Sequence, residues 1–316
     1  MGIVEPAALT RWLTLAAALA IVVPATACSR PAPAAAQGCK GRGATMKFDE
    51  RLILKAVTNG QSGRDIAAAI FAGDVAKVRA LVQTDPAVLT THVPPARYPD
   101  FRPDGQAGDL LSFAVARCDP AMRDALLQLG AKPDGAIPGL PLDTAIDVHD
   151  LDAMRALLAA GASPDPQGED AVWPLRTAAR VADPAAAKLL IAHKAKLDRT
   201  DSTGSSPLQD AVDMDSMQVA EVLIEAGANP WAVGAGGALP AYGIAQPLKL
   251  SSPDEEAARQ RLEAKLRASG APWPPPAPAD VKAAIREQRW PPAALAKVGA
   301  TPPPPVVVAT LTKTTR

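Results

Sequence analysis

The sequence predicts an all-α protein that is built from repeated pairs of helices, and two observations carry this prediction. Only 3% of the 316 residues are aromatic although 48% are hydrophobic, so alanine and aliphatic side chains must form the core. Alanine favours the helix and lets neighbouring helices approach closely, whereas a large β-sandwich needs more aromatic and β-branched residues. The second observation is a short motif that recurs along the middle of the chain every 31 to 33 residues.

The motif starts at Gly130 as Gly-Ala-Lys-Pro-Asp and returns in variant form at Gly161, Lys194 and Gly227. A leucine stands 19 residues before each copy, and three residues after it an alanine predicts a closely packed first helix. Eight residues after the leucine stands a residue type that caps helix N-termini, which predicts a second helix. Over five copies, the first counted from Ile66, the alanines are Ala69, Ala114, Ala145, Ala178 and Ala211, and the capping residues are Asp74, Asp119, Asp150, Asp183 and Ser216.

This pattern resembles the ankyrin repeat, a unit of 33 residues in which Thr-Pro-Leu-His-x-Ala opens the first helix. The best match runs from Asp201 to Ala211, where the sequence reads DSTGSSPLQDA. The histidine of the family motif is replaced in the four clearest copies, by Ser112, Asp143, Arg176 and Gln209. The resemblance implies an all-α ankyrin solenoid of five to six repeats with helical caps.

Composition and helical spacing divide the rest of the chain. Caps are expected because the terminal units of a repeat array leave an apolar face open. The expected order is a signal peptide at 1–27, a flexible Pro/Ala-rich tether at 28–45, an N-terminal capping helix at 46–65, ankyrin repeats at 66–273 with an insertion at 90–108, a helical extension at 274–300 and a disordered tail at 301–316.

The first residues have the features of a bacterial export signal. Arg11 precedes an uncharged apolar run at 12–23, which as a helix would cover roughly 18 Å of a hydrocarbon core of about 30 Å. The run is therefore too short to span a membrane and is typical of a cleaved signal peptide. The sequence Ala-Thr-Ala-Cys that ends at Cys28 resembles the lipobox of bacterial lipoproteins, which implies lipidation of Cys28, and Ser29 after the cysteine implies attachment to the outer membrane. Simple cleavage, which would give a soluble periplasmic protein, is the alternative.

Charge and cysteine content exclude several classes of protein. Lys and Arg together equal Asp and Glu, at 33 each, so the net charge predicts no binding to nucleic acid. The three cysteines lack metal-ligand spacing, and we expect neither metal nor cofactor. In an oxidising compartment Cys39 and Cys118 can form a disulfide. Free thiols and an intermolecular bond are the alternatives.

The resemblance also implies where a partner would bind. In ankyrin proteins the residue five positions after the signature leucine lies on the concave face, and here that column reads Ala116, Asp147, Arg180 and Asp213. Asp143 and Arg176 share a helix face with the column one turn earlier. Two interpretations stay open, an ion-pair ladder between repeats or a charge pattern that selects a partner. Aromatic and basic residues of the insertion and of a loop tip are further partner-binding candidates, although they can equally cover apolar edges: Tyr98, Phe101, Arg102 and Trp231.

The expected function is therefore a non-catalytic protein–protein interaction module, monomeric and held in the bacterial cell envelope. Gly-rich phosphate loops, His-Glu-x-x-His and Gly-x-Ser-x-Gly are absent from the sequence, so nothing in it predicts an enzyme. The alternative is a periplasmic immunity or inhibitor protein that binds and neutralises a toxic effector enzyme. A protective scaffold for a resident envelope enzyme is the third hypothesis.

Overall fold

In a computed structural model of the protein, the described residues are 49–94, 108–168, 171–248 and 252–312, and all of them belong to one compact unit. The expected signal peptide, the lipidation site Cys28, the tether and Cys39 lie outside these residues. Tyr98, Phe101 and Arg102 of the insertion also lie outside them.

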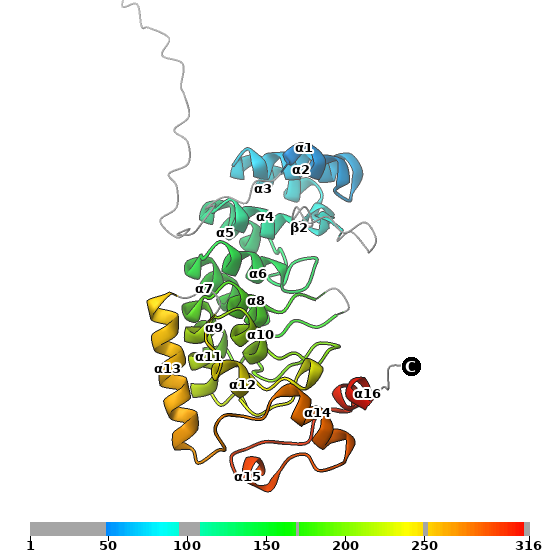
Figure 1. Cartoon of the computed structure of the whole chain (residues 1–316). Helices are drawn as coiled ribbons and strands as arrows, with labels where there is room; N and C mark the ends of the chain where they lie inside the picture. Colours follow the sequence, from blue (N-terminus) through cyan, green and yellow to red (C-terminus); the bar gives the residue numbers. More distant parts are fainter. Residues whose placement is uncertain (1–48, 95–107, 169–170, 249–251, 313–316) are drawn as a thin grey trace, which may run out of the picture. The chain divides into compact units, whose positions relative to one another are not determined.

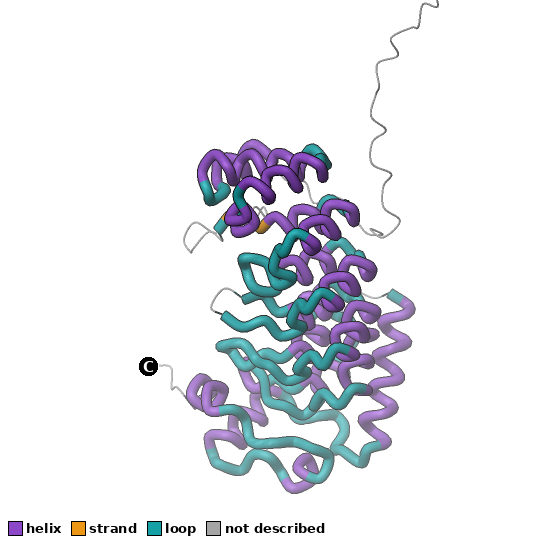
Figure 2. The backbone as a smooth tube through the Cα atoms, turned by 180° about the vertical axis from the view of Figure 1, so that it is seen from behind, coloured by secondary structure: helices purple, strands orange, loops and turns teal. Residues whose placement is uncertain are grey.

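Pairs of consecutive helices, stacked in chain order, make up most of this unit (Figure 1). The first helix of each pair packs against the first helix of the next, and the loops between pairs lie together along one side of the stack (Figure 2). The pairs are α2 (Gly60–Phe71) with α3 (Val75–Thr84), α4 (Leu110–Ala116) with α5 (Pro120–Gln128), α6 (Leu140–Asp147) with α7 (Leu151–Ala159), α8 (Pro174–Arg180) with α9 (Pro184–Ala192), α10 (Pro207–Asp213) with α11 (Met217–Glu225), and α12 (Pro240–Ile244) with α13 (Pro253–Ala268).

The turn inside each of the first five pairs has the same backbone conformation. A residue with a positive φ of 54° to 67° stands two positions after the end of the first helix and directly before the cap of the second: Gly73, Cys118, His149, Ala182 and Asp215. The four expected aspartate caps are confirmed, because each side chain accepts a hydrogen bond from a backbone N–H in the first turn of its helix. Ser216 stands at the cap position without such a bond. His149 also contacts the next repeat, with its Nδ1 2.9 Å from the Asp183 carboxylate.

The core is continuous from pair to pair because the same positions are buried in each repeat. The alanines three residues after each signature leucine, or after Ile66, are at most 2% exposed, which lets the first helices approach closely. A leucine in the second helix of four repeats is fully buried: Leu126, Leu157, Leu190 and Leu223. These small and aliphatic side chains form the core that the composition predicts.

The N-terminal end differs from the expected boundaries. The cap is a shorter helix, α1 (Glu50–Ala56), and α2 already begins at Gly60, so the boundary expected between 65 and 66 falls inside a helix. A 3-10 helix η1 (Pro86–Thr90) follows α3, and two short antiparallel strands, β1 (His92–Val93) and β2 (Gly108–Asp109), flank the insertion.

The C-terminal end contains more regular structure than expected. The long helix α13 stands along the stack and packs against α11 and α12 (Figures 1 and 2). It is followed by α14 (Pro278–Arg286) and α15 (Ala293–Ala296). The expectation of a disordered tail at 301–316 is wrong for residues 305–312, which form α16 (Pro305–Thr312). Val307 and Leu311 are buried where α16 packs on α14 and the 3-10 helix η2 (Ala235–Gly237), and this packing explains its order.

Among the described residues, no helix has the length and apolar character that crossing a bilayer requires.

Candidate functional site

Three exposed charged residues of alternating sign occupy equivalent positions on neighbouring first helices. Asp147 ends α6, Arg180 ends α8 and Asp213 ends α10, and these helices pack side by side. We call the three residues the charged column. Ala116, at the equivalent position of α4, is 1% exposed, so the exposed column begins at α6.

Arg180 lies opposite two carboxylates but forms no ion pair within the described part of the chain. Burial is the main reason that the pKa of Asp143 is raised from 3.8 to about 6, and the charge of Asp147 adds to the rise. A hydrogen bond with Thr177 and the charge of Arg180 act in the opposite direction. Partial loss of hydration also raises the pKa of Asp147, against the charges of Arg180 and His149. The positive charge of Arg180 thus stabilises the ionised forms of Asp143 and Asp147 on this face.

Arg176 was expected to share this face with Arg180, and the structure gives it a different role. Its guanidinium forms an ion pair of 3.0 Å with Asp201 and a two-point contact with Asp210, both in the next repeat. Asp210 also accepts a hydrogen bond of 2.9 Å from the Ser205 hydroxyl. The Arg176 guanidinium lies 5.3 Å from the centre of the Trp173 ring. Because Arg176 contacts Trp173 in its own repeat and two carboxylates of the next, it joins the fourth and fifth repeats. Arg180 is exposed and can contact another molecule.

Beside the charged column lies a large apolar side chain that the sequence reasoning missed. Met214 follows Asp213 directly and is 55% exposed. The Asp213 carboxylate accepts a hydrogen bond of 2.8 Å from the Gln209 side chain, which fixes its position next to Met214. A methionine adapts its shape to an irregular surface, so an exposed one is suited to a contact with a partner. The sequence signal that could have indicated this exposure is the position of Met214 in the repeat, one residue after the charged position.

Trp231 is not part of this face. The sequence places it near a loop tip, either as a partner contact or as cover for an apolar edge, and its exposure of 1% makes it part of the core. The ring is buried in the loop region that follows α11.

Backbone hydrogen bonds to aspartate side chains fix the loops beside the first helices. Asp134 accepts from the backbone N–H of Ser163 at 2.7 Å, and Asp165 accepts from that of Lys196 at 2.9 Å. Each bond joins a loop to the equivalent loop of the next repeat. The charged column is therefore carried by helices whose flanking loops are tied together.

Cys118 lies in the positive-φ turn after α4 and is disulfide-bonded. The other two cysteines of the chain, Cys28 and Cys39, lie outside the described residues, so its pairing with Cys39 stays a prediction. In the part of the chain that the structure describes, no group of three or more His, Cys, Asp and Glu side chains is placed to hold a metal ion. What the charged column can do chemically is form directional ion pairs with another molecule.

Comparison with known proteins agrees with the repeat architecture. A family model described as ankyrin repeats, in three copies, matches residues 141–233. This range covers the helices α6 to α11 and therefore the whole charged column. No curated protein matches the sequence. The fold is an all-α ankyrin solenoid, and repeats of this kind are typically non-catalytic interaction domains.

Proposed function

Because residues 141–233 are ankyrin repeats, we propose that the protein is a non-catalytic module that binds a protein partner through the charged column and Met214. The observation that carries this proposal is the contrast between two arginines one helical turn apart. Arg176 is held by two carboxylates of the next repeat, whereas Arg180 is exposed and has no ion pair among the described residues. Alternating exposed charges on fixed helices select a partner with the complementary pattern.

The proposed location is the bacterial periplasm, with attachment to the outer membrane through a lipid on Cys28. The apolar run at 12–23 and the lipobox-like sequence before Cys28 support export. A disulfide at Cys118 also supports it, since disulfides persist in oxidising compartments and are rare in the cytosol.

Charge reversal at Arg180 tests the binding face. Purified wild type and Arg180→Glu are used to capture partners from an envelope extract, with Arg155→Glu as the matched control. Arg155 is exposed on α7, in the second-helix layer, and its ion pair among the described residues is with Asp152 at 2.6 Å. We expect Arg180→Glu to weaken capture of the main partner by about tenfold to a hundredfold.

Folding is measured separately by circular dichroism, because the introduced glutamate will also repel Asp143 and Asp147. Equal capture by all three proteins would refute binding at the charged column. The immunity interpretation requires more than capture. The partner must be an enzyme whose activity the wild type suppresses, and Arg180→Glu must suppress it less.

A second experiment tests the lipid anchor. We expect Cys28→Ala to move the protein from the membrane fraction to the soluble periplasmic fraction, because a residue without a thiol cannot be lipidated. Cys39→Ala is the matched control and should leave fractionation unchanged. Unchanged fractionation of Cys28→Ala would disprove lipidation and leave export as a separate question.

A further inference from the structure

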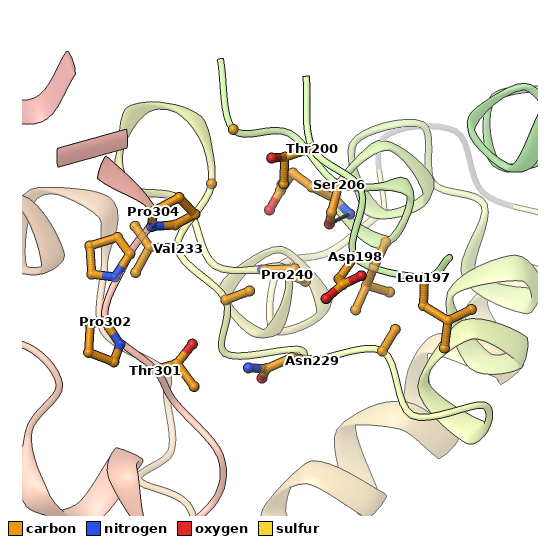
Figure 3. Close-up of a pocket in the computed structure, with 17 residues that line it drawn as sticks. Leu197, Asp198, Thr200, Ser206, Asn229, Val233, Pro240, Thr301, Pro302 and Pro304 are labelled. Atoms are coloured by element: carbon orange, nitrogen blue, oxygen red, sulfur yellow. Dashed lines mark hydrogen bonds between the residues drawn. The ribbon is translucent and has the colours of Figure 1, made fainter. Parts of the chain in front are cut away.

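We infer that a pocket between the last repeats and the C-terminal segment binds an organic cation, a primary ammonium or guanidinium group on a short aliphatic stem. Gln209 of the pocket lining contacts Asp213 of the charged column, but this inference is argued from Asp198 and the pocket walls and does not depend on the proposed function. Figure 3 shows Asp198 on one side of the pocket, Pro302 and Pro304 on the other, and Pro240 between them.

Hydrogen bonds hold the two walls of the pocket in place. Asn229, in the loop after α11, donates from its side chain to the Gly299 carbonyl at 2.9 Å. The indole N–H of Trp290 donates to the Thr301 carbonyl at 3.2 Å, directly before the three prolines that line the pocket. The segment at 299–304 is therefore attached at two points to form one wall, and the repeats form the other.

One charged acceptor without a partner among the described residues lines this pocket. Asp198 is exposed and makes no hydrogen bond or ion pair with any described residue, and it is the one ionisable side chain among the lining residues. Gln209 also lines the pocket, but it is 4% exposed and its Oε1 is buried, so this oxygen is not accessible from the pocket. The orientation of its amide is fixed, because Nε2 donates to the Asp213 carboxylate. The exposed carboxylate of Asp198 therefore favours a ligand that is positively charged and donates hydrogen bonds.

The size and the walls of the pocket indicate the rest of the ligand. Its volume is about 190 Å³, and a cavity of ~150 Å³ already holds benzene. Apolar side chains form much of its lining, among them Leu208, Val233, Pro240 and Pro304. These dimensions fit a chain of about four carbons that ends in an ammonium or guanidinium group, either as a small molecule or as a lysine or arginine side chain.

The test is a titration of the purified full-length protein with butylammonium and butylguanidinium, followed by two-dimensional NMR of the tryptophan indole N–H signals. The indole of Trp290 contacts the pocket wall at Thr301 and reports on occupancy, and Trp290→Phe assigns its signal. Butanol is the neutral control of similar shape. We expect saturable shifts with both cations and at least tenfold weaker binding of butanol.

Two variants locate the binding site. Asp198→Asn removes the charge and, since Asp198 has no partner among the described residues, leaves the fold intact; it should weaken cation binding at least tenfold. Gly234→Ala narrows the pocket, and its added Cβ would meet no atom closer than 3.5 Å, so it should also bind more weakly. The matched control is Asp254→Asn on α13, which lies outside the pocket and should bind like the wild type.

Several results would overturn the inference: no shift with either cation, equal binding of butanol, or unchanged binding by Asp198→Asn. Capped tripeptides with a central lysine or arginine between alanines distinguish the two sources of the cation. Peptide binding as tight as that of the free amine would assign the pocket to a basic side chain of a protein. Binding of the free amines alone would assign it to a small molecule.

Discussion

The charged form of the Asp143 carboxylate is disfavoured by its burial. Its Oδ1 is buried without a hydrogen-bond partner in the described structure, and Asp147 lies one turn away on the same helix. Burial raises its pKa to about 6, so the folded state binds a proton between pH 3.8 and 6 that the unfolded state has already released. Asp143 therefore lowers the stability of the fold as the pH rises through this interval, and its full cost is present above pH 6.

Replacing Asp143 with asparagine should remove this cost. We expect Asp143→Asn to be more stable than the wild type at pH 7.5 by about 1–3 kcal/mol and equally stable near pH 4. Urea unfolding at several pH values measures the difference, and Asp152→Asn, an exposed position on α7, is the control. A stability difference that did not change with pH would contradict the assigned role of Asp143.

The sequence predicts which side chains share the first-helix face but not how they pair. Asp143, Asp147, Arg176 and Arg180 follow from helical spacing alone. The partners of Arg176 depend on the path of the loop before α10, which brings Asp201 near it, and on the burial of Asp210. Neither the loop path nor the depth of a side chain is contained in the repeat spacing. For the same reason the sequence left open whether Trp231 is buried, and it did not predict the exposure of Met214.

At the scale of whole elements, the helix caps and the buried alanine positions were predictable because they recur at the same spacing in each repeat. Four aspartate caps stand where the spacing places them. α16 has no such repetition, and its sequence begins after prolines and contains three consecutive valines, which favour strands over helices. Packing of Val307 and Leu311 overrides these local preferences, and packing with distant elements is not visible in a local sequence.

The order of α16 should therefore depend on its buried side chains. We expect Leu311→Ala to increase hydrogen exchange of the amides at 305–312 at least tenfold, because it removes one of two buried apolar anchors and ~2–5 kcal/mol of packing. The control Thr310→Ala removes an exposed hydroxyl from the same helix. Exchange measured by mass spectrometry should change little in α6 to α11. Equal protection of 305–312 in both variants would contradict the packing explanation.

At the scale of the whole molecule, a stack of repeats is stable only through contacts between neighbours. Arg176 forms such a contact between the fourth and fifth repeats, through Asp201 and the buried Asp210. The binding face crosses the same boundary, since Arg180 and Asp213 lie on opposite sides of it. The ion pairs of Arg176 thus hold together two repeats that must keep their spacing for a partner to meet both charges.

Removing the ion pair between Arg176 and Asp210 should weaken the contact between the fourth and fifth repeats. We expect Asp210→Ala to lower the free energy of unfolding by about 2–4 kcal/mol, since it leaves Arg176 half-buried with only one carboxylate. It should also separate the unfolding of the N-terminal repeats from that of the C-terminal ones, so urea curves followed by circular dichroism and by tryptophan fluorescence no longer coincide. Asp152→Ala, which removes an exposed carboxylate from its ion pair with the exposed Arg155 on α7, is the control and should keep coincident curves. A single transition in Asp210→Ala, with unchanged midpoint, would show that the apolar core alone couples the fourth and fifth repeats.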